Sequence, residues 1–160
     1  MKSVNITSTY TIYDSVSELP NTAQNLMQQA IIARNNAYAP YSKFVVGAAI
    51  LLDNGEIVLG NNQENAAYPS GLCAERVAIY SASANFPNMG IKALAITATA
   101  LATDLDQPVA PCGSCRQSIS EYEIKQNSPI AIYFMGKIGK IIKSDSLKDL
   151  LPLAFDKSFL

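Results

Sequence analysis

Histidine is absent from this 160-residue chain, and only three cysteines are present. A structural zinc site normally needs four ligands, and the chain lacks the fourth Cys or His that such a site requires. An odd number of cysteines also does not form the disulfide framework of a small secreted protein. No apolar run reaches the ~18 residues of a membrane span, and residues 1–20 lack the basic start and apolar centre of a signal peptide. We therefore expect a cytoplasmic protein with no membrane partner.

Charged residues are also scarce. They make up 16% of the chain, against a typical ~25%, and the net charge is only −1. No basic patch stands out, so nucleic acid is not an expected partner. So few charges leave little to cover the surface of a monomer, which favours an oligomer. The tail Leu150–Phe155 is too apolar to lie free in water and favours the same conclusion.

The three cysteines that are present fall in two short segments. Cys73 begins Cys-Ala-Glu-Arg, and Cys112 and Cys115 belong to Pro-Cys-Gly-Ser-Cys-Arg-Gln. A catalytic zinc keeps three protein ligands and leaves its fourth position open for water. Three thiols, with Glu75 two residues after the first of them, therefore favour a catalytic site that holds one Zn²⁺ per chain.

Two other interpretations of these cysteines remain open. Buried cysteine is common as a small apolar core residue. The pair Cys112 and Cys115 also has the C-x-x-C spacing of a thioredoxin-like redox centre. Neither interpretation explains why the third cysteine stands in Cys-Ala-Glu at the head of an apolar helical run.

Hydrophobic periodicity and turn residues predict one α/β domain over residues 21–160, preceded by a polar N-terminal extension over residues 1–20. The continuous apolar run Phe44–Leu52 is typical of a strand buried on both faces, and Asn54-Gly55 predicts a hairpin after it. The expected sheet is mixed and has five strands, of which the last two form an antiparallel hairpin around Gly136-Lys137. We expect strands at 44–52, 56–62, 91–99, 130–135 and 138–143, and helices at 21–36, 72–84, 114–122 and 146–151.

Both cysteine segments stand at predicted helix starts, where free backbone N–H groups and the helix dipole stabilise thiolates. Three thiolates would nevertheless weaken the ability of a zinc ion to acidify water, unless a cation hydrogen-bonded to the sulfurs offsets their charge. Arg76 is the first candidate for that cation, and Arg116 is the second. Either arginine could instead be an ordinary surface charge.

The two cysteine segments together resemble the zinc-dependent cytidine deaminase family, in its short, three-cysteine, homotetrameric branch; the signature is already described for zinc deaminases. The resemblance runs from Tyr38–Phe44 through Asn62–Tyr68 to Leu150–Phe155 and leaves only the first 20 residues outside it. It implies a three-layer α/β/α cytidine-deaminase-like fold. It also implies a homotetramer in which neighbouring subunits complete each active site.

The resemblance further implies roles for individual residues. Those that match the zinc ligands are Cys73, Cys112 and Cys115, and Glu75 matches the residue that shuttles protons. Asn62 and Glu64 match a pair that hydrogen-bonds the 3′-hydroxyl of the sugar, and their i, i+2 spacing independently places both side chains on one face of a strand. The matched substrate contacts are Phe44, Asn62, Glu64, Tyr68, Ala74 and Phe155.

Phe44 matches an aromatic residue that lies against the pyrimidine ring, with plain core packing as its alternative role. Tyr68 and Phe155 match positions that reach the substrate from neighbouring subunits. The implied reaction is hydrolytic deamination of cytidine and 2′-deoxycytidine to the uridines, with release of ammonia, in pyrimidine salvage. The alternative is a sibling deaminase acting on another amino-heterocycle, such as a nucleoside antibiotic or a modified cytidine. A zinc-stabilised binding module without catalysis is a third hypothesis.

Overall fold

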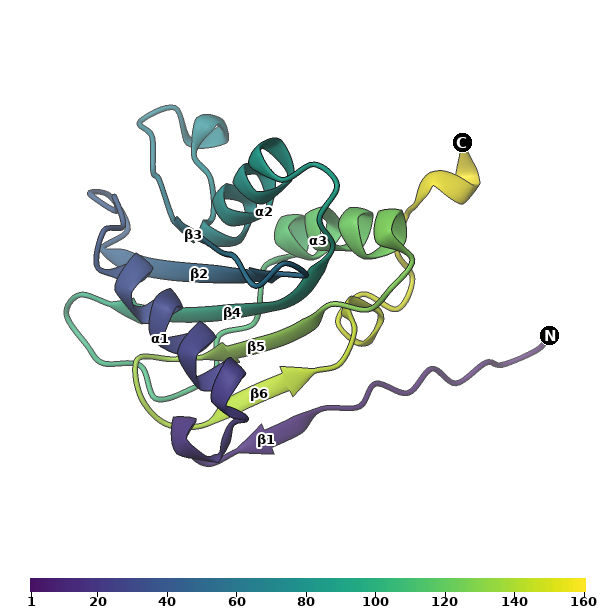
Figure 1. Ribbon diagram of the computed structural model, residues 1–160, viewed down its shortest axis with the longest axis horizontal. Coiled ribbons are helices and arrows are strands. Elements are labelled where there is room, and N and C mark those ends of the chain that lie inside the picture. Colours follow the sequence, from purple (N-terminus) through teal and green to yellow (C-terminus); the bar gives the residue numbers. More distant parts are fainter.

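The computed structural model describes residues 1–160 and contains one mixed sheet with helices on both of its faces (Figure 1). The strand order is β1-β6-β5-β4-β2-β3, and β4 and β5 run parallel while the other neighbours are antiparallel. The elements are β1 (Thr11–Tyr13), α1 (Asn21–Arg34), β2 (Phe44–Leu52), β3 (Ile57–Asn61), α2 (Ala74–Asn85), β4 (Ile91–Ala100), α3 (Gly113–Gln126), β5 (Ala131–Met135) and β6 (Ile141–Ser144).

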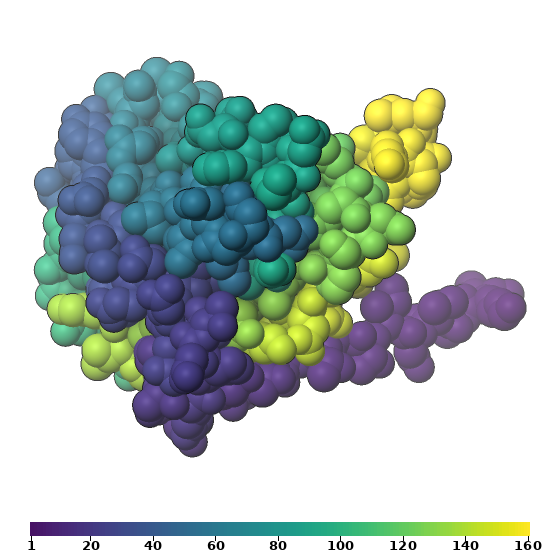
Figure 2. All heavy atoms as spheres, in the orientation of Figure 1, coloured from purple at the N-terminus to yellow at the C-terminus, as the bar shows by residue number.

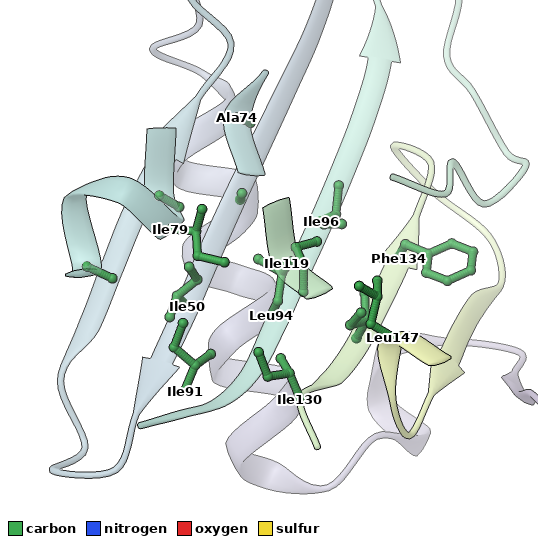
Figure 3. Close-up of a cluster of buried hydrophobic side chains, with 14 of the residues drawn as sticks. Ile50, Ala74, Ile79, Ile91, Leu94, Ile96, Ile119, Ile130, Phe134 and Leu147 are labelled. Atoms are coloured by element: carbon green, nitrogen blue, oxygen red, sulfur yellow. The ribbon is translucent and has the colours of Figure 1, made fainter. Parts of the chain in front are cut away.

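Each face of the sheet has its own apolar core, because helices cover both faces. α1 lies on one face, where Ala49 of β2 and Ala95 of β4 belong to its cluster. α2 and α3 cover the opposite face, where their side chains pack with Ile50 of β2 and Leu94 of β4 (Figure 3). The predicted three-layer α/β/α arrangement is therefore confirmed, and so is a strand at 44–52 with apolar neighbours on both faces.

The sheet has six strands where five were expected, because the N-terminal residues contribute β1. This strand pairs with β6 at the sheet edge and places Ile12 opposite Ile142. Only three residues pair, and Ile12 stays 60% exposed, so neither length nor burial marks the strand in the sequence. The N-terminal end of the chain and its C-terminal residues both project from the body of the molecule (Figure 2).

The two helices of the second face begin directly after Cys73 and Cys112, as the sequence predicts. α3 continues past its expected end and stops before Asn127, whose φ of 52° is the left-handed conformation that asparagine tolerates at a helix C-terminus. The expected terminal helix is only a short 3-10 turn, Leu147–Asp149, since Pro152 cannot continue a helix. None of the helices combines the length and the apolar character needed to cross a membrane.

Candidate active site

The three cysteines, 39 or more residues apart across the two segments, meet where α2 and α3 begin. Their sulfur atoms all lie within 4.8 Å of one another, and Cys73 Sγ is 3.9 Å from Cys112 Sγ. All three are free thiols. A tetrahedral zinc with Zn–S bonds of about 2.3 Å would hold two sulfurs roughly 3.8 Å apart. The donor type and the spacing of this cluster therefore fit a zinc ion.

The packing of α2 against β3 brings the first turn of α2 to this point. Gly60 of β3 allows the close approach, because a Cβ at that position would lie 2.4 Å from the carbonyl oxygen of Ala74. Ala74 itself is fully buried in the core. It is absent from the residues that line the cavity beside Cys73 and Cys112, so the polar group that it can offer is its backbone N–H at the helix start.

The pKa values of the Cys73 and Cys115 thiols shift in opposite directions. A hydrogen bond with Cys115 is the main factor that lowers the pKa of Cys73 to about 5, and Arg76 lowers it further. The same hydrogen bond, together with burial, raises the pKa of the Cys115 thiol well above its usual range. Of these two thiols, Cys73, the sulfur that lies beside an arginine, therefore ionises more readily.

The structure separates the two candidate arginines. Arg76 donates from Nη2 to Cys73 Sγ over 3.7 Å, and this hydrogen bond raises the pKa of its guanidinium. Its Nε is buried without a hydrogen-bond partner. Arg116 does not contact a sulfur and donates instead to the carbonyl oxygens of Pro111 and Leu150. Only Arg76 can therefore offset the charge of the thiolates directly.

Glu75 lies in the first turn of α2 and is 5% exposed. Burial raises the pKa of its carboxyl, and hydrogen bonds from its own N–H and from Cys115 oppose the change less strongly. The carboxyl lines the same cavity as Cys73 and Cys112. Burial therefore favours the protonated form of this carboxyl, which can exchange its proton with a molecule in the cavity.

Cys73 and Cys112 line a cavity of about 780 Å³, large enough for a small organic ligand, whereas Cys115 is fully buried and absent from the lining. The lining of the cavity comes from the start of β2, the segment after β3 and the starts of α2 and α3. The sequence-predicted residues that line it are Phe44, Asn62, Glu64, Tyr68, Cys73, Glu75, Arg76 and Cys112.

Asn62 and Glu64 share this cavity, and both are held by the backbone. The amide of Asn62 accepts from Val46 N at 2.8 Å and donates to Phe44 O at 2.9 Å. The carboxylate of Glu64 accepts from Ser42 Oγ and from the N–H groups of two loop residues, and these bonds lower its pKa. An amide offers four hydrogen-bonding sites and a carboxylate about four, so each side chain keeps at least one for a ligand.

Tyr68 and Phe155 are both exposed, but only Tyr68 lines the cavity. Tyr68 is 77% exposed at the cavity rim and contacts the edge of the Tyr41 ring, with 6.1 Å between ring centroids. Phe155 is absent from the cavity lining, is 59% exposed, and stacks on Phe159. Within one chain, therefore, Phe155 does not reach the site.

Sequence reasoning missed the part played by Ser42. Its hydroxyl donates to Glu64 and accepts from Phe44 N at 3.0 Å, which joins two sides of the cavity. The segment Tyr38–Phe44 resembled the family, but no property of a single serine indicates a partner 22 residues away.

Comparison with known proteins agrees with this geometry. Residues 20–128 match the family described as "Cytidine and deoxycytidylate deaminase zinc-binding region". The chain is 42% identical over 137 residues to the cytidine deaminase of Sporosarcina psychrophila, a match that covers 86% of this chain and 93% of that protein. It is 38% identical over 132 residues to the cytidine deaminase of Halalkalibacterium halodurans, with 82% and 92% covered.

The fold is likewise similar to a solved structure. The crystal structure of cytidine deaminase from Burkholderia pseudomallei superposes with a TM-score of 0.73 at 37% sequence identity, over 86% of this chain and 100% of the other. The match to the family covers well over half of the sequence and includes all three cysteines. This chain belongs to the cytidine and deoxycytidylate deaminase family.

Proposed function

We propose that this protein catalyses hydrolytic deamination of cytidine and 2′-deoxycytidine to the corresponding uridines, with release of ammonia. The observation that carries the proposal is the buried carboxyl of Glu75 near three converging thiols, at a cavity large enough to hold a nucleoside. The names of the relatives, all cytidine deaminases, support the same substrate.

The residues that would hold one zinc ion per chain are Cys73, Cys112 and Cys115. A zinc ion bound there would act as a Lewis acid and lower the pKa of a water molecule. Arg76, which donates to Cys73 Sγ, would limit the negative charge that the thiolates place on the site.

Glu75 would carry the protons of the reaction. It would accept a proton from water and deliver it to N3 of the pyrimidine as C4 is attacked. It would then take the proton of the hydroxyl group now on C4 and pass it to the departing amine. Its raised pKa suits this work, because one carboxyl must both accept and donate within a single turnover.

The sugar and the base would be held by the rest of the cavity. Phe44 would lie against the pyrimidine, and Asn62 and Glu64 would hydrogen-bond the 3′-hydroxyl. The lowered pKa of Glu64 keeps it charged, so it would repel a 5′- or 3′-phosphate. We therefore infer a nucleoside substrate, and neither a nucleotide nor a nucleic acid.

We further propose a cytoplasmic homotetramer, in which the catalytic domain at 21–160 supplies residues to neighbouring sites. Tyr68 and Phe155 are the residues proposed to reach a neighbouring substrate, and their exposed fractions of 77% and 59% are compatible with contact across subunits. Their exposure also leaves apolar surface that an assembly would cover.

The test measures uridine formation from cytidine, cytidine monophosphate and single-stranded DNA, on protein with about one zinc per chain by elemental analysis. We expect turnover of the nucleoside alone. Glu64→Gln keeps the shape of the side chain but removes its charge, so kcat/KM for cytidine should fall roughly 10–100-fold. The ratio of kcat/KM for cytidine to that for cytidine monophosphate should also become smaller. Zinc-loaded protein that does not deaminate cytidine would contradict the substrate assignment and direct attention to another amino-heterocycle.

A further inference from the structure

Arg116 bridges two distant parts of the backbone beside the cysteine pair. Its Nε donates to Pro111 O at 2.8 Å, and its Nη1 donates to Leu150 O at 2.9 Å. Pro111 directly precedes Cys112, whereas Leu150 directly follows the 3-10 turn after β6 and is 7% exposed. The guanidinium therefore joins the turn that carries one of the three thiols to a buried corner of the C-terminal segment.

The same corner is held from its other side by the N-terminal extension. Ser8 Oγ and Tyr10 Oη donate to Asp149 O at 2.8 and 2.7 Å, and Thr9 N donates to the Asp149 carboxylate at 3.3 Å. The extension is fixed in turn by the pairing of β1 with β6, and Figure 1 shows it continuing outward from β1, the edge strand of the sheet. The region that matches the family begins only at residue 20, so these contacts are additional to it.

We propose that Arg116 is a positioning residue, which holds the turn before Cys112 against the corner Asp149–Leu150, and that Ser8–Tyr10 brace the far side of this corner. This inference rests on the proposed zinc site, but not on the identity of the substrate. The extension thereby acquires a role at the active site without touching it.

The shape of arginine explains why this residue type stands here. A guanidinium presents its N–H groups in one rigid plane, so two carbonyl oxygens can be held at a fixed separation. The ammonium of a lysine is a flexible point charge and would hold one carbonyl at a time. Gln117, the next residue, adds a third link by donating to Phe155 O at 2.8 Å.

The first experiment compares Arg116→Ala and Arg116→Lys with wild type in the rate of zinc loss to a chelator. Partners that orient metal ligands typically contribute roughly 10–100-fold to metal affinity, so we expect zinc loss to accelerate by about that factor in both variants. Glu121→Ala, at an exposed position of the same helix, is the control and should release zinc at the wild-type rate. Wild-type release from both Arg116 variants would overturn the proposal.

A second readout separates positioning from general destabilisation. In zinc-free protein, alkylation of Cys112 relative to Cys73 is measured by mass spectrometry, and the ratio should rise in the Arg116 variants. Uniform loosening of the fold would change both thiols together and would contradict positioning. The alkylation ratio is measured without zinc or substrate. It therefore tests the role of Arg116 even if the protein does not deaminate cytidine.

The far side of the corner is tested with Tyr10→Phe, which removes one hydroxyl, and with deletion of residues 1–10, which leaves β1 in place. The loss of one neutral hydrogen bond corresponds to roughly twofold to tenfold, which bounds the acceleration of zinc loss in Tyr10→Phe. Deletion of residues 1–10 should accelerate zinc loss more than Tyr10→Phe does. Release from the deleted protein at the wild-type rate would remove the extension from the proposal.

Discussion

Two buried carboxylates in the same helical layer differ in how they are bonded. Glu123, near the end of α3, is 6% exposed and accepts hydrogen bonds from Ile130 N at 2.8 Å, Leu147 N at 2.9 Å and Ser146 Oγ at 2.6 Å. Glu75, at the start of α2, is equally buried but faces the cavity beside the thiols. Burial raises its pKa more than its few hydrogen bonds lower it.

The comparison shows that the hydrogen-bond donors around a buried carboxyl group, and not its burial alone, determine its role. A carboxylate that receives three donors from distant backbone and side chains fixes those segments and has little capacity left for a ligand. A carboxyl that is desolvated without such donors is stabilised in its protonated form and can give that proton to a neighbour. Glu123 is therefore expected to contribute to stability, and Glu75 to chemistry.

The largest expected effect is on turnover. Glu75→Gln preserves the size of the side chain and leaves the three thiols in place, but it cannot accept a proton. General acid–base catalysis contributes typically 10²–10⁴-fold, so kcat for cytidine should fall by roughly that factor or more. Zinc content and the melting temperature are measured alongside and should stay near wild type. A variant that keeps more than about a tenth of the activity would exclude Glu75 from proton transfer.

The next effect is on stability. Glu123→Ala leaves the N–H groups of Ile130 and Leu147 buried without an acceptor, at roughly 1–3 kcal/mol each. We expect the free energy of unfolding to fall by about 2–5 kcal/mol, seen as a melting temperature lower by roughly 5–15 °C in circular dichroism. The folded fraction should lose far less turnover than the 10²-fold expected for proton transfer.

Glu123→Gln is the matched control for that variant. Its amide oxygen can still accept from both N–H groups, and its NH₂ can donate to the hydroxyl of Ser146. It should therefore be destabilised by only about 1 kcal/mol. Equal losses of stability in the alanine and glutamine variants would show that the charge itself, and not the pair of backbone donors, is what matters at this position.

The comparison also shows which parts of the molecule could be predicted from sequence. The starts of α2 and α3 were predictable, because a cysteine motif and an apolar periodicity coincide within a few residues. The location of Glu75 near the thiols was predictable, because it stands two residues after Cys73. The strand Phe44–Leu52 was predictable, because an uninterrupted apolar run of this length is typical of a strand that is buried on both faces.

The features that could not be predicted all depend on partners far apart in the chain. Arg116 meets a carbonyl 34 residues away, and Ser8 meets one 141 residues away. Glu123 reads in the sequence as an ordinary charged helix residue, and its burial follows only from the return of the chain after β6. β1 is too short and exposed to be marked by its own residues. The local sequence pattern predicts helices and strands, whereas these long-range hydrogen bonds become visible only in the folded structure.

The smallest expected effect is that of Ser146→Ala, which removes one of the three hydrogen-bond donors to Glu123. Ser146→Ala removes the hydroxyl that donates to Glu123 and accepts from Lys148 N at 3.2 Å. Both buried N–H groups keep their acceptor, and water can replace the hydroxyl at this half-buried position, so the loss should be about 1–2 kcal/mol. Urea unfolding measures it, and kcat/KM for cytidine should not change. Combined with Glu123→Ala, the serine change should add almost nothing, because its partner is already gone. Full additivity would show that Ser146 stabilises the turn without acting through Glu123.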